Sequence, residues 1–285
     1  MSDESAEHFE DVVDVVVRCR NEMPFTERTL AGLSMQRAPR ARVLFIDCSS
    51  SDGSREAAVS AGARVVDLAP EAYVPGRVLN AGMEMTRSNV VAFVNADAIP
   101  LDEGALGRLV APLFRVTRVA ATFGRQIARP DADLLTKVDY ARAFGDRAPV
   151  QTRRGAFFSM AASAIRRDVW AALPFDEELC YSEDVDWTQR VSALGWGVQY
   201  VPEAVFEHSH SYDLRAHLKR RSGEGRADKA IFRLGPPSVV KDLLRPLAGS
   251  IARDVRARAL SPSGLAVRVA QAAGYFAGRR SAARS

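Results

Sequence analysis

An amide and a carboxylate follow an apolar run in the first half of the chain. Residues 90–94 are all apolar, Asn95 and Asp97 come directly after them, and Pro100 stops the run. Such a run predicts a buried strand of a parallel sheet, and open α/β sheets bind ligands at the carboxyl ends of their strands. Carboxylate and amide oxygens are hard ligands, suited to Mg²⁺ or Mn²⁺ that bridges a substrate diphosphate. Asp97 could instead only cap a helix that begins at Pro100.

A second acidic group stands in the C-terminal half. Ser182 is a typical N-cap, and Glu183 and Asp184 fall in the first turn of a helix expected over residues 184–194. Acids in a first turn favour the helix dipole in any protein. Helix stability therefore explains the two acids, although it does not explain why the segment lies where it does.

The elements that position these residues begin with two earlier apolar runs. Residues 11–18 precede polar side chains, and residues 43–47 end in Asp47. Helices predicted over 24–36 and 54–61, and a strand over 63–68, complete a β-α-β-α-β order, which is typical of a nucleotide-binding α/β half. No G-x-G-x-x-G or G-x-x-x-x-G-K-[ST] motif follows these strands, so dinucleotide and P-loop binding are disfavoured.

The remaining pattern alternates between helix and strand as far as residue 194. We predict an α/β fold with a mostly parallel central sheet flanked by helices. The further predicted elements are helices over 80–86, 101–114, 134–144 and 167–173, and strands over 119–125 and 157–165. Residues 128–154 are polar and poorly periodic, and we expect an irregular excursion over the ligand crevice there.

Composition places the chain among soluble globular proteins. Of its 285 residues, 47% are hydrophobic and 26% are charged. The three cysteines are far apart and form no C-x-x-C pair, which supports neither a zinc site nor a disulfide framework. The first residues are acidic, and no apolar stretch reaches the roughly 18 residues that a membrane span requires. We therefore expect a reduced, cytoplasmic protein.

The charge divides unevenly along the chain. Residues 215–285 hold 16 Lys or Arg and 4 Asp or Glu, a formal charge of +12 within a total of +4. They also contain three amphipathic helical segments, over 239–247, 251–260 and 265–276. A basic extension indicates an anionic partner such as a membrane surface, which would place the protein at the inner face of the cell membrane. It could equally be a solvated face or pair with a second copy of the chain, and we expect no nucleic acid as partner.

With these residues in view, the chain resembles family 2 glycosyltransferases of the GT-A fold, and within them the rhamnosyltransferase-like branch. The resemblance covers roughly residues 12–220. It rests on ordered motifs at residues 46–54, 95–100, 183–187 and 205–210. In the first motif, Cys48 stands where the family has a second acid or a serine, and Ser49 stands where it has glycine. In the second motif, Asn95 stands where the family has the first acid. The resemblance implies a nucleotide-sugar domain over 1–214 and a basic helical extension over 215–285.

The resemblance also implies roles for individual residues. Asp97 would be the main carboxylate ligand of Mg²⁺ or Mn²⁺, with His208 preferred over His210 as a second ligand. Asp184, with Glu183 beside it, would be the catalytic base. The expected nucleotide-sugar contacts are Arg18, Asp47, Arg77, Asn95, Asp97 and Arg125. Trp187, one helical turn after Asp184, could stack on the acceptor sugar or could be a core aromatic residue.

These roles together imply an inverting glycosyltransferase. It would move a sugar from a UDP, dTDP or GDP donor to the hydroxyl of a glycan, lipid-linked or small-molecule acceptor, in the synthesis of a cell-surface glycan, glycolipid or secondary metabolite. A single base opposite the leaving group implies inversion. Two alternatives are a nucleotide-sugar-binding scaffold without turnover and a nucleotidyltransferase. The second would need a glycine-rich basic loop after the first strand, and residues 19–22 contain no glycine.

Overall fold

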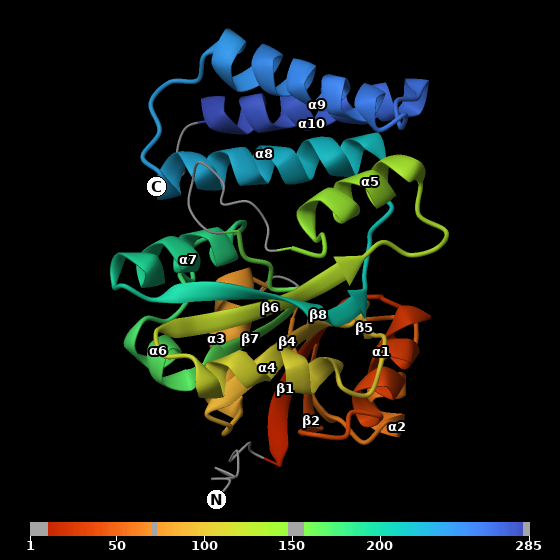
Figure 1. Cartoon of the computed structure of the whole chain (residues 1–285), viewed down its shortest axis with the longest axis vertical. Helices are drawn as coiled ribbons and strands as arrows, with labels where there is room; N and C mark the ends of the chain where they lie inside the picture. Colours follow the sequence, from red (N-terminus) through yellow and green to blue (C-terminus); the bar gives the residue numbers. More distant parts are fainter. Residues whose placement is uncertain (1–10, 70–72, 148–156, 282–285) are drawn as a thin grey trace, which may run out of the picture.

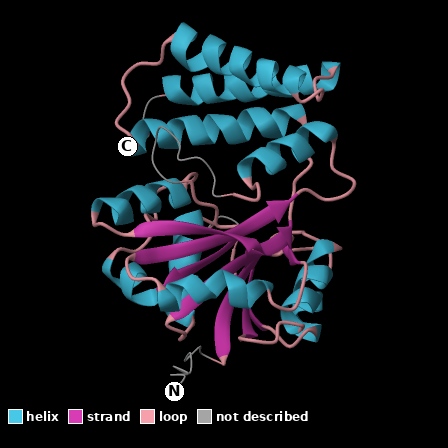
Figure 2. Ribbon diagram, in the orientation of Figure 1, coloured by secondary structure: helices cyan, strands magenta, loops and turns pink. Residues whose placement is uncertain are grey.

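The computed structural model describes residues 11–69, 73–147 and 157–281. An eight-stranded sheet forms the centre of the molecule, and helices cover both of its faces (Figures 1 and 2). The strands are β1 (Val12–Cys19), β2 (Arg40–Asp47), β3 (Arg64–Asp67), β4 (Val90–Asn95), β5 (Ile99–Pro100), β6 (Val119–Ile127), β7 (Ala162–Arg166) and β8 (Gly197–Glu207). The predicted α/β class with a central sheet flanked by helices is confirmed.

The helices fall into two groups. Those around the sheet are α1 (Phe25–Ser34), α2 (Ser54–Ser60), α3 (Pro75–Met85), α4 (Ala105–Arg115), α5 (Leu134–Ala143), α6 (Arg167–Ala172) and α7 (Glu183–Ala193). Those of the C-terminal layer, at the top of Figure 1, are α8 (Leu214–Ile231), the π-helix η2 (Val239–Leu244), α9 (Arg245–Arg256) and α10 (Pro262–Arg280). None of the described helices has the length and apolar character needed to cross a membrane.

The strand order is β3-β2-β1-β4-β7-β6-β8-β5. Strands β3, β2, β1 and β4 run parallel, β7 is antiparallel to both of its neighbours, and β6 and β8 are parallel to each other. The register pairs Cys19 with Asp47 and Arg18 with Asn95. The polar carboxyl ends of β1, β2 and β4 therefore meet at one edge of the sheet, where α/β sheets bind their ligands.

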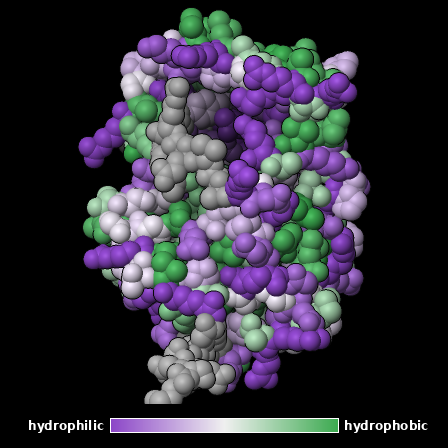
Figure 3. Space-filling model, in the orientation of Figure 1, coloured by the Kyte–Doolittle hydropathy of each residue, from purple (hydrophilic) through white to green (hydrophobic). Residues whose placement is uncertain are grey.

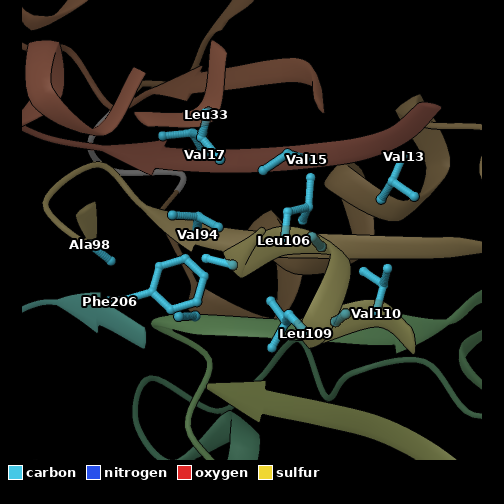
Figure 4. Packing of buried hydrophobic residues seen from close by; sticks show 14 of the residues in the cluster. Val13, Val15, Val17, Leu33, Val94, Ala98, Leu106, Leu109, Val110 and Phe206 are labelled. Carbon is cyan, nitrogen blue, oxygen red and sulfur yellow. The ribbon is translucent and has the colours of Figure 1, made fainter. Parts of the chain in front are cut away.

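The core explains why the strand sequences are nearly continuous in apolar residues. Val13, Val15 and Val17 of β1 pack toward α1 and α4, where Leu33 and Leu106 approach them (Figure 4). Val16 points to the other side of the sheet, where it packs in a cluster with residues of α3, α6 and α7. A strand that is buried on both faces gains from apolar side chains at every position.

Several predicted boundaries need correction. Pro100 belongs to the short strand β5, and the helix predicted over 101–114 is α4, which begins at Ala105. The strand predicted over 157–165 is formed only at Ala162–Arg166, and its first residues carry no strand. The long strand β8 was not predicted, because Pro202 and two glutamates interrupt its alternation of apolar and polar residues. The predicted excursion over 128–154 contains the expected helix α5, and part of it lies outside the described residues.

The C-terminal layer is held together by close backbone contact and buried charge. A side chain at Gly274 or Gly278 of α10 would place its Cβ 2.5 Å from Leu218 O or 2.0 Å from Ser222 O of α8. Glycine is therefore needed for these two helices to approach. Arg268 of α10, only 6% exposed, bonds to Asp254 of α9 and to Asp139 of α5. These bonds tie α5, which lies against the sheet, to the C-terminal layer.

Candidate active site

Arg18 contacts two other predicted site residues, Asn95 and Glu183. Its Nη2 donates to Asn95 Oδ1 at 3.0 Å, and its Nη1 lies 3.8 Å from Glu183 Oε1. Arg18 and Asn95 come from neighbouring parallel strands, whereas Glu183 opens α7. The guanidinium therefore connects the sheet edge to the helix that carries Asp184.

Asp97 lies in the turn after β4 and is almost fully buried, with 1% of its surface exposed. Its Oδ1 is 3.5 Å from His208 Nε2, and its Oδ2 is 3.5 Å from His210 Nδ1. One ligand atom from each of these three residues lies within 4.8 Å of the others, so they could hold a metal ion. We call Asp97, His208 and His210 the metal cluster. Both histidines follow the end of β8, which places them opposite the end of β4.

The His208 ring is oriented by a neighbouring amide. Its Nδ1 is 2.8 Å from Gln126 Oε1, and the amide of Gln126 is itself fixed by a 2.9 Å bond to Ser159 Oγ. When Nδ1 donates to this oxygen, Nε2 keeps its lone pair, and that buried atom has no hydrogen-bond partner among the described residues. An imidazole held by its second nitrogen is the usual arrangement of a metal-bound histidine. The donor set therefore fits a divalent cation.

Arg129 supplies positive charge on the other side of Asp97. Its Nη2 donates to Asp97 Oδ2 at 2.9 Å and to the Asp97 carbonyl at 3.1 Å, and its guanidinium lies 3.5 Å from the centre of the Phe25 ring. Burial alone would raise the pKa of Asp97, but the imidazoles of the metal cluster and Arg129 hold that pKa well below its usual range. Asp97 is therefore a carboxylate at every physiological pH.

His210 of the metal cluster and the nearby Glu22 have displaced pKa values. Burial lowers the pKa of His210 to about 4, against the opposing effect of Asp97, so its imidazole is neutral at pH 7 and able to accept a cation. Burial, together with the charge of Asp97, raises the pKa of Glu22 to about 7. The raised pKa of Glu22 shows that a second carboxyl group lies within the electrostatic field of Asp97.

A chain of ring contacts connects the metal cluster to α8. The rings of His210 and Tyr212 are stacked with centroids 5.1 Å apart, and Arg220 lies over Tyr212 and donates to its hydroxyl at 3.0 Å. Arg220 also donates to Glu224 Oε1 at 3.0 Å. Glu224 in turn contributes to the electrostatic field at Asp184. The C-terminal layer therefore closes the site from the side opposite the sheet.

Asp184 has the protonation behaviour of a general base. Burial of its carboxyl group and the charge of Glu183 raise the pKa of Asp184 to about 7, while Val185 N and Arg18 act in the opposite direction. A base is most effective when its pKa lies close to the working pH. The raised pKa is opposite to the effect of the helix dipole, which favours ionised carboxylates in a first turn.

Three other predicted contact residues lie at different places. Asp47, at the end of β2, is 1% exposed and accepts from Ser50 N at 2.9 Å, while its Oδ1 has no partner among the described residues. Arg77 is half exposed on α3, 3.7 Å from Glu177, and Arg125 of β6 is paired with Asp146. Neither arginine has a described contact with the metal cluster, so the structure does not bring them together with Asp97.

Trp187 is a core residue, which corrects its expected place in an acceptor site. Its ring is 0% exposed, stacks on Phe175 with centroids 5.3 Å apart, and donates from Nε1 to Leu173 O at 2.8 Å. Trp187 lies about one helical turn after Asp184 on α7, and its ring is turned into the core. Of the two readings of Trp187, the core aromatic is correct for this structure.

Sequence reasoning missed several members of the site. Arg129 and Tyr212 come from the loops after β6 and β8, and Arg220 and Glu224 come from α8. A local signal existed only for Tyr212, which stands two residues after His210. The others are polar residues in ordinary surroundings, and pairing of β6 with β8 is what brings Gln126 and Arg129 beside the histidines.

The sheet order, with an acid and two histidines at its carboxyl edge and an acid pair on a facing helix, defines the GT-A class of nucleotide-sugar-dependent glycosyltransferase folds. The family model described as "Glycosyltransferase like family 2" matches residues 11–227. The chain belongs to this family.

Two curated relatives are O-antigen chain rhamnosyltransferases from Salmonella. WbaN of Salmonella anatum is 28% identical over 214 residues, which are 71% of this chain and 65% of the relative. RfbN of Salmonella typhimurium is 30% identical over 166 residues, which are 54% of this chain and 50% of the relative. The chain thus spans less than two thirds of the length of each.

Solved structures support the same fold. The mannosyltransferase PcManGT from Pyrobaculum calidifontis, in complex with GDP-Man and Mn²⁺, matches 91% of this chain and 73% of its own length, with a TM-score of 0.61 and 18% identity. Glucosyl-3-phosphoglycerate synthase from Mycobacterium tuberculosis, with Mn²⁺, UDP-glucose and phosphoglyceric acid, matches 78% of this chain and 80% of its own, with a TM-score of 0.55 and 18% identity. At this identity the likeness concerns the fold.

Proposed function

We propose that the chain is an inverting, divalent-metal-dependent glycosyltransferase that moves a sugar from a nucleoside-diphosphate donor to an acceptor hydroxyl. The observation that carries the proposal is the link through Arg18, which contacts Asn95 two residues before Asp97 and approaches Glu183 beside Asp184. This link supports a single site with the metal cluster on one side and, on the other, a base with a pKa of about 7.

The metal cluster would hold the donor diphosphate. Asp97, His208 and His210 offer one oxygen and two nitrogen ligands to Mg²⁺ or Mn²⁺. A bound cation supplies positive charge that offsets the two negative charges of the departing diphosphate. Asp47, at the end of β2 two strands away from β4, has a buried carboxylate oxygen without a described partner, which suits a donor from the nucleotide base or ribose.

Asp184 would act on the acceptor. Its carboxylate takes the proton of the acceptor hydroxyl as the oxygen forms a bond to the anomeric carbon, and the bond from that carbon to the diphosphate oxygen breaks on the opposite face. One base and one displacement give inversion of the anomeric centre. Arg18 approaches Glu183 beside the base, and its charge lowers the pKa of Asp184 toward 7.

The relatives suggest the identity of the sugar. Both curated relatives are rhamnosyltransferases of O-antigen chains, which supports rhamnose as the donated sugar and a glycan as the acceptor. A lipid-linked or small-molecule acceptor fits the same base. The basic extension, with its formal charge of +12, supports a peripheral contact with the inner face of the cytoplasmic membrane, and a homodimer through the same helices is the competing use of that surface.

Ligand-dependent thermal stability tests the donor half of the proposal. Unfolding would be followed with UDP, dTDP, GDP and their sugars, each with and without Mn²⁺. A ligand at about 100 times its dissociation constant adds roughly 2.7 kcal/mol to the free energy of unfolding. We expect a Mn²⁺-dependent rise in Tm for one nucleotide class, abolished by Asp97→Asn. No shift with any of them would contradict the proposal.

Turnover separates the enzyme from a nucleotide-sugar-binding scaffold. Release of nucleoside diphosphate from the donor identified above would be measured with wild type and with Asp184→Asn. A glycosyltransferase loses release in the variant while nucleotide binding is retained. Binding with no release by the wild type, in the presence of glycan acceptors, would favour the scaffold.

A further inference from the structure

A cationic and apolar groove runs along α8, away from the metal cluster. It consists of two adjoining cavities of about 540 and 570 Å³ that share Lys229 and Leu234. One end is walled by the loop before α7, including Cys180 and Tyr181, and the other by the segment that joins α8 to η2 and by the end of α10. We call it the α8 groove.

The α8 groove is lined by positive charge. Arg226 and Lys229 project from α8, Arg233 follows the C-terminal end of that helix, and Arg280 of α10 lines the far end. Arg226 and Arg233 are exposed and form no ion pair with any residue in the described part of the chain. Glu178 is the one acid among the lining residues that the structure describes. A concave surface with this charge attracts an anion.

Apolar side chains lie beside these charges. Leu234, Pro236 and Phe276 line the groove. Val239, at its rim, and Val240 and Leu244, which follow in η2, are 53%, 63% and 51% exposed. On the face shown in Figure 3, hydrophobic residues are likewise interspersed with hydrophilic ones over the helical layer at the top. Exposed aliphatic residues next to Lys and Arg are typical of surfaces that enter the headgroup region of a bilayer.

We propose that the α8 groove binds the phosphate group of an anionic membrane lipid, with Val239, Val240 and Leu244 inserted at the boundary between headgroups and acyl chains. Charge complementarity selects the phosphate. The exposed aliphatic rim distinguishes a lipid from a free phosphate, because a soluble anion leaves that rim in water.

The groove lies close to the proposed base. Tyr181 packs against α8 so tightly that a Cβ at Gly223 would be 2.4 Å from its ring, and Glu183 and Asp184 follow two and three residues later. A lipid phosphate in the groove would therefore sit beside the loop that leads to Asp184. Presentation of a lipid-borne hydroxyl to that base rests on the proposed function, whereas lipid binding itself does not.

Co-sedimentation with vesicles tests the proposal on the full chain. We expect binding to vesicles that contain phosphatidylglycerol, weaker binding to phosphatidylcholine alone, and a loss of affinity of about tenfold or more in the double variant Arg226→Gln/Arg233→Gln. Val240→Ser should weaken binding at high salt, where the aliphatic contact remains and the charges are screened. The matched control is Arg253→Gln/Arg256→Gln, which removes two exposed charges from α9 outside the groove.

Three outcomes would overturn the proposal. The first is no sedimentation of the wild type with phosphatidylglycerol vesicles. The second is an equal loss in the groove and control variants, which would make the attraction a matter of net charge alone. The third is full displacement from vesicles by glycerol 3-phosphate, which would identify a site for soluble phosphates. Nucleotide binding by each variant shows that it is folded. Loss of sugar transfer with vesicle binding intact would count against the proposed function alone.

Discussion

The guanidinium of Arg18 lies 3.8 Å from the carboxylate of Glu183 and forms a hydrogen bond to Asn95 on the next strand. Three segments far apart in the chain meet in this contact. The charge of Glu183 raises the pKa of Asp184, and the charge of Arg18 lowers it. The protonation of the proposed base therefore depends on the contact between Arg18 and Glu183.

Replacement of Arg18 tests that dependence. Arg18→Gln removes a positive charge near Asp184, so the acidic limb of the pH profile of kcat/KM should move to higher pH. The profile is measured with saturating metal. Arg20→Gln is the matched control, since Arg20 is an exposed residue just beyond the same strand. An unchanged profile in Arg18→Gln would show that the contact does not reach the base.

The pH dependence of the wild type follows from Asp184. Its pKa is raised to about 7, and a base works only when deprotonated, so kcat/KM should rise with pH up to about 7 and then level. Asp184→Asn should lower kcat by roughly 10²–10⁴-fold. Asp186→Asn, which removes a carboxylate paired with Arg190 on the same helix, is the control and should retain activity. Activity that falls with rising pH between 5 and 7 would contradict the assignment.

The same shift predicts an effect on stability. A carboxyl group whose pKa is higher in the folded than in the unfolded protein favours folding below the unfolded value of 3.8, and this contribution is lost as the pH rises through about 7. Asp184→Asn should therefore have a higher Tm than wild type at pH 8 and a smaller advantage at pH 5. Thermal unfolding at both values checks this, and an equal difference at both would count against the shift.

Metal binding should depend on the orientation of His208. Gln126→Leu removes the acceptor for its Nδ1, and we expect Mn²⁺ affinity to fall by about 10–100-fold, as for other outer-shell partners. Gln126→Glu retains an acceptor oxygen and should retain most of the affinity. Asp97→Asn should lower it further, whereas Asp102→Asn, an exposed acid paired with Arg108, should not. Titration calorimetry with Mn²⁺ measures each, and unchanged affinity in Gln126→Leu would contradict the proposed tautomer.

The C-terminal layer should depend on one buried arginine. Arg268→Met leaves Asp254, which is 1% exposed, without its partner, and breaking a buried pair in this way costs about 3–5 kcal/mol. Urea unfolding measures the change. Arg256→Met, at an exposed position of α9, should be nearly neutral. Arg268→Met with Asp254→Leu should recover part of the loss, and no recovery would mean that the ion pair is not the cause.

The sequence by itself determined the strands that are buried on both faces and the polar residues that end them. The run at β4 is apolar at five of six positions, and β1 and the second half of β2 are mostly apolar, so the strands are recognisable without knowledge of their neighbours. Asp97 follows from its place at the end of a strand, Asp184 and the two histidines follow from the resemblance, and the ordered motifs identified the family, which the match over residues 11–227 confirms.

Tertiary structure alone decided which of these residues act together. Pairing of β6 with β8 brings Gln126 and Arg129 beside the histidines, and packing of α7 turns Trp187 into the core while Glu183 meets Arg18. These contacts join residues up to 165 positions apart, from Arg18 to Glu183. No local sequence pattern encodes these contacts, because each side chain is compatible with its own helix or strand whether or not the contact forms. The contacts are determined by how the helices pack when both faces of the sheet are buried.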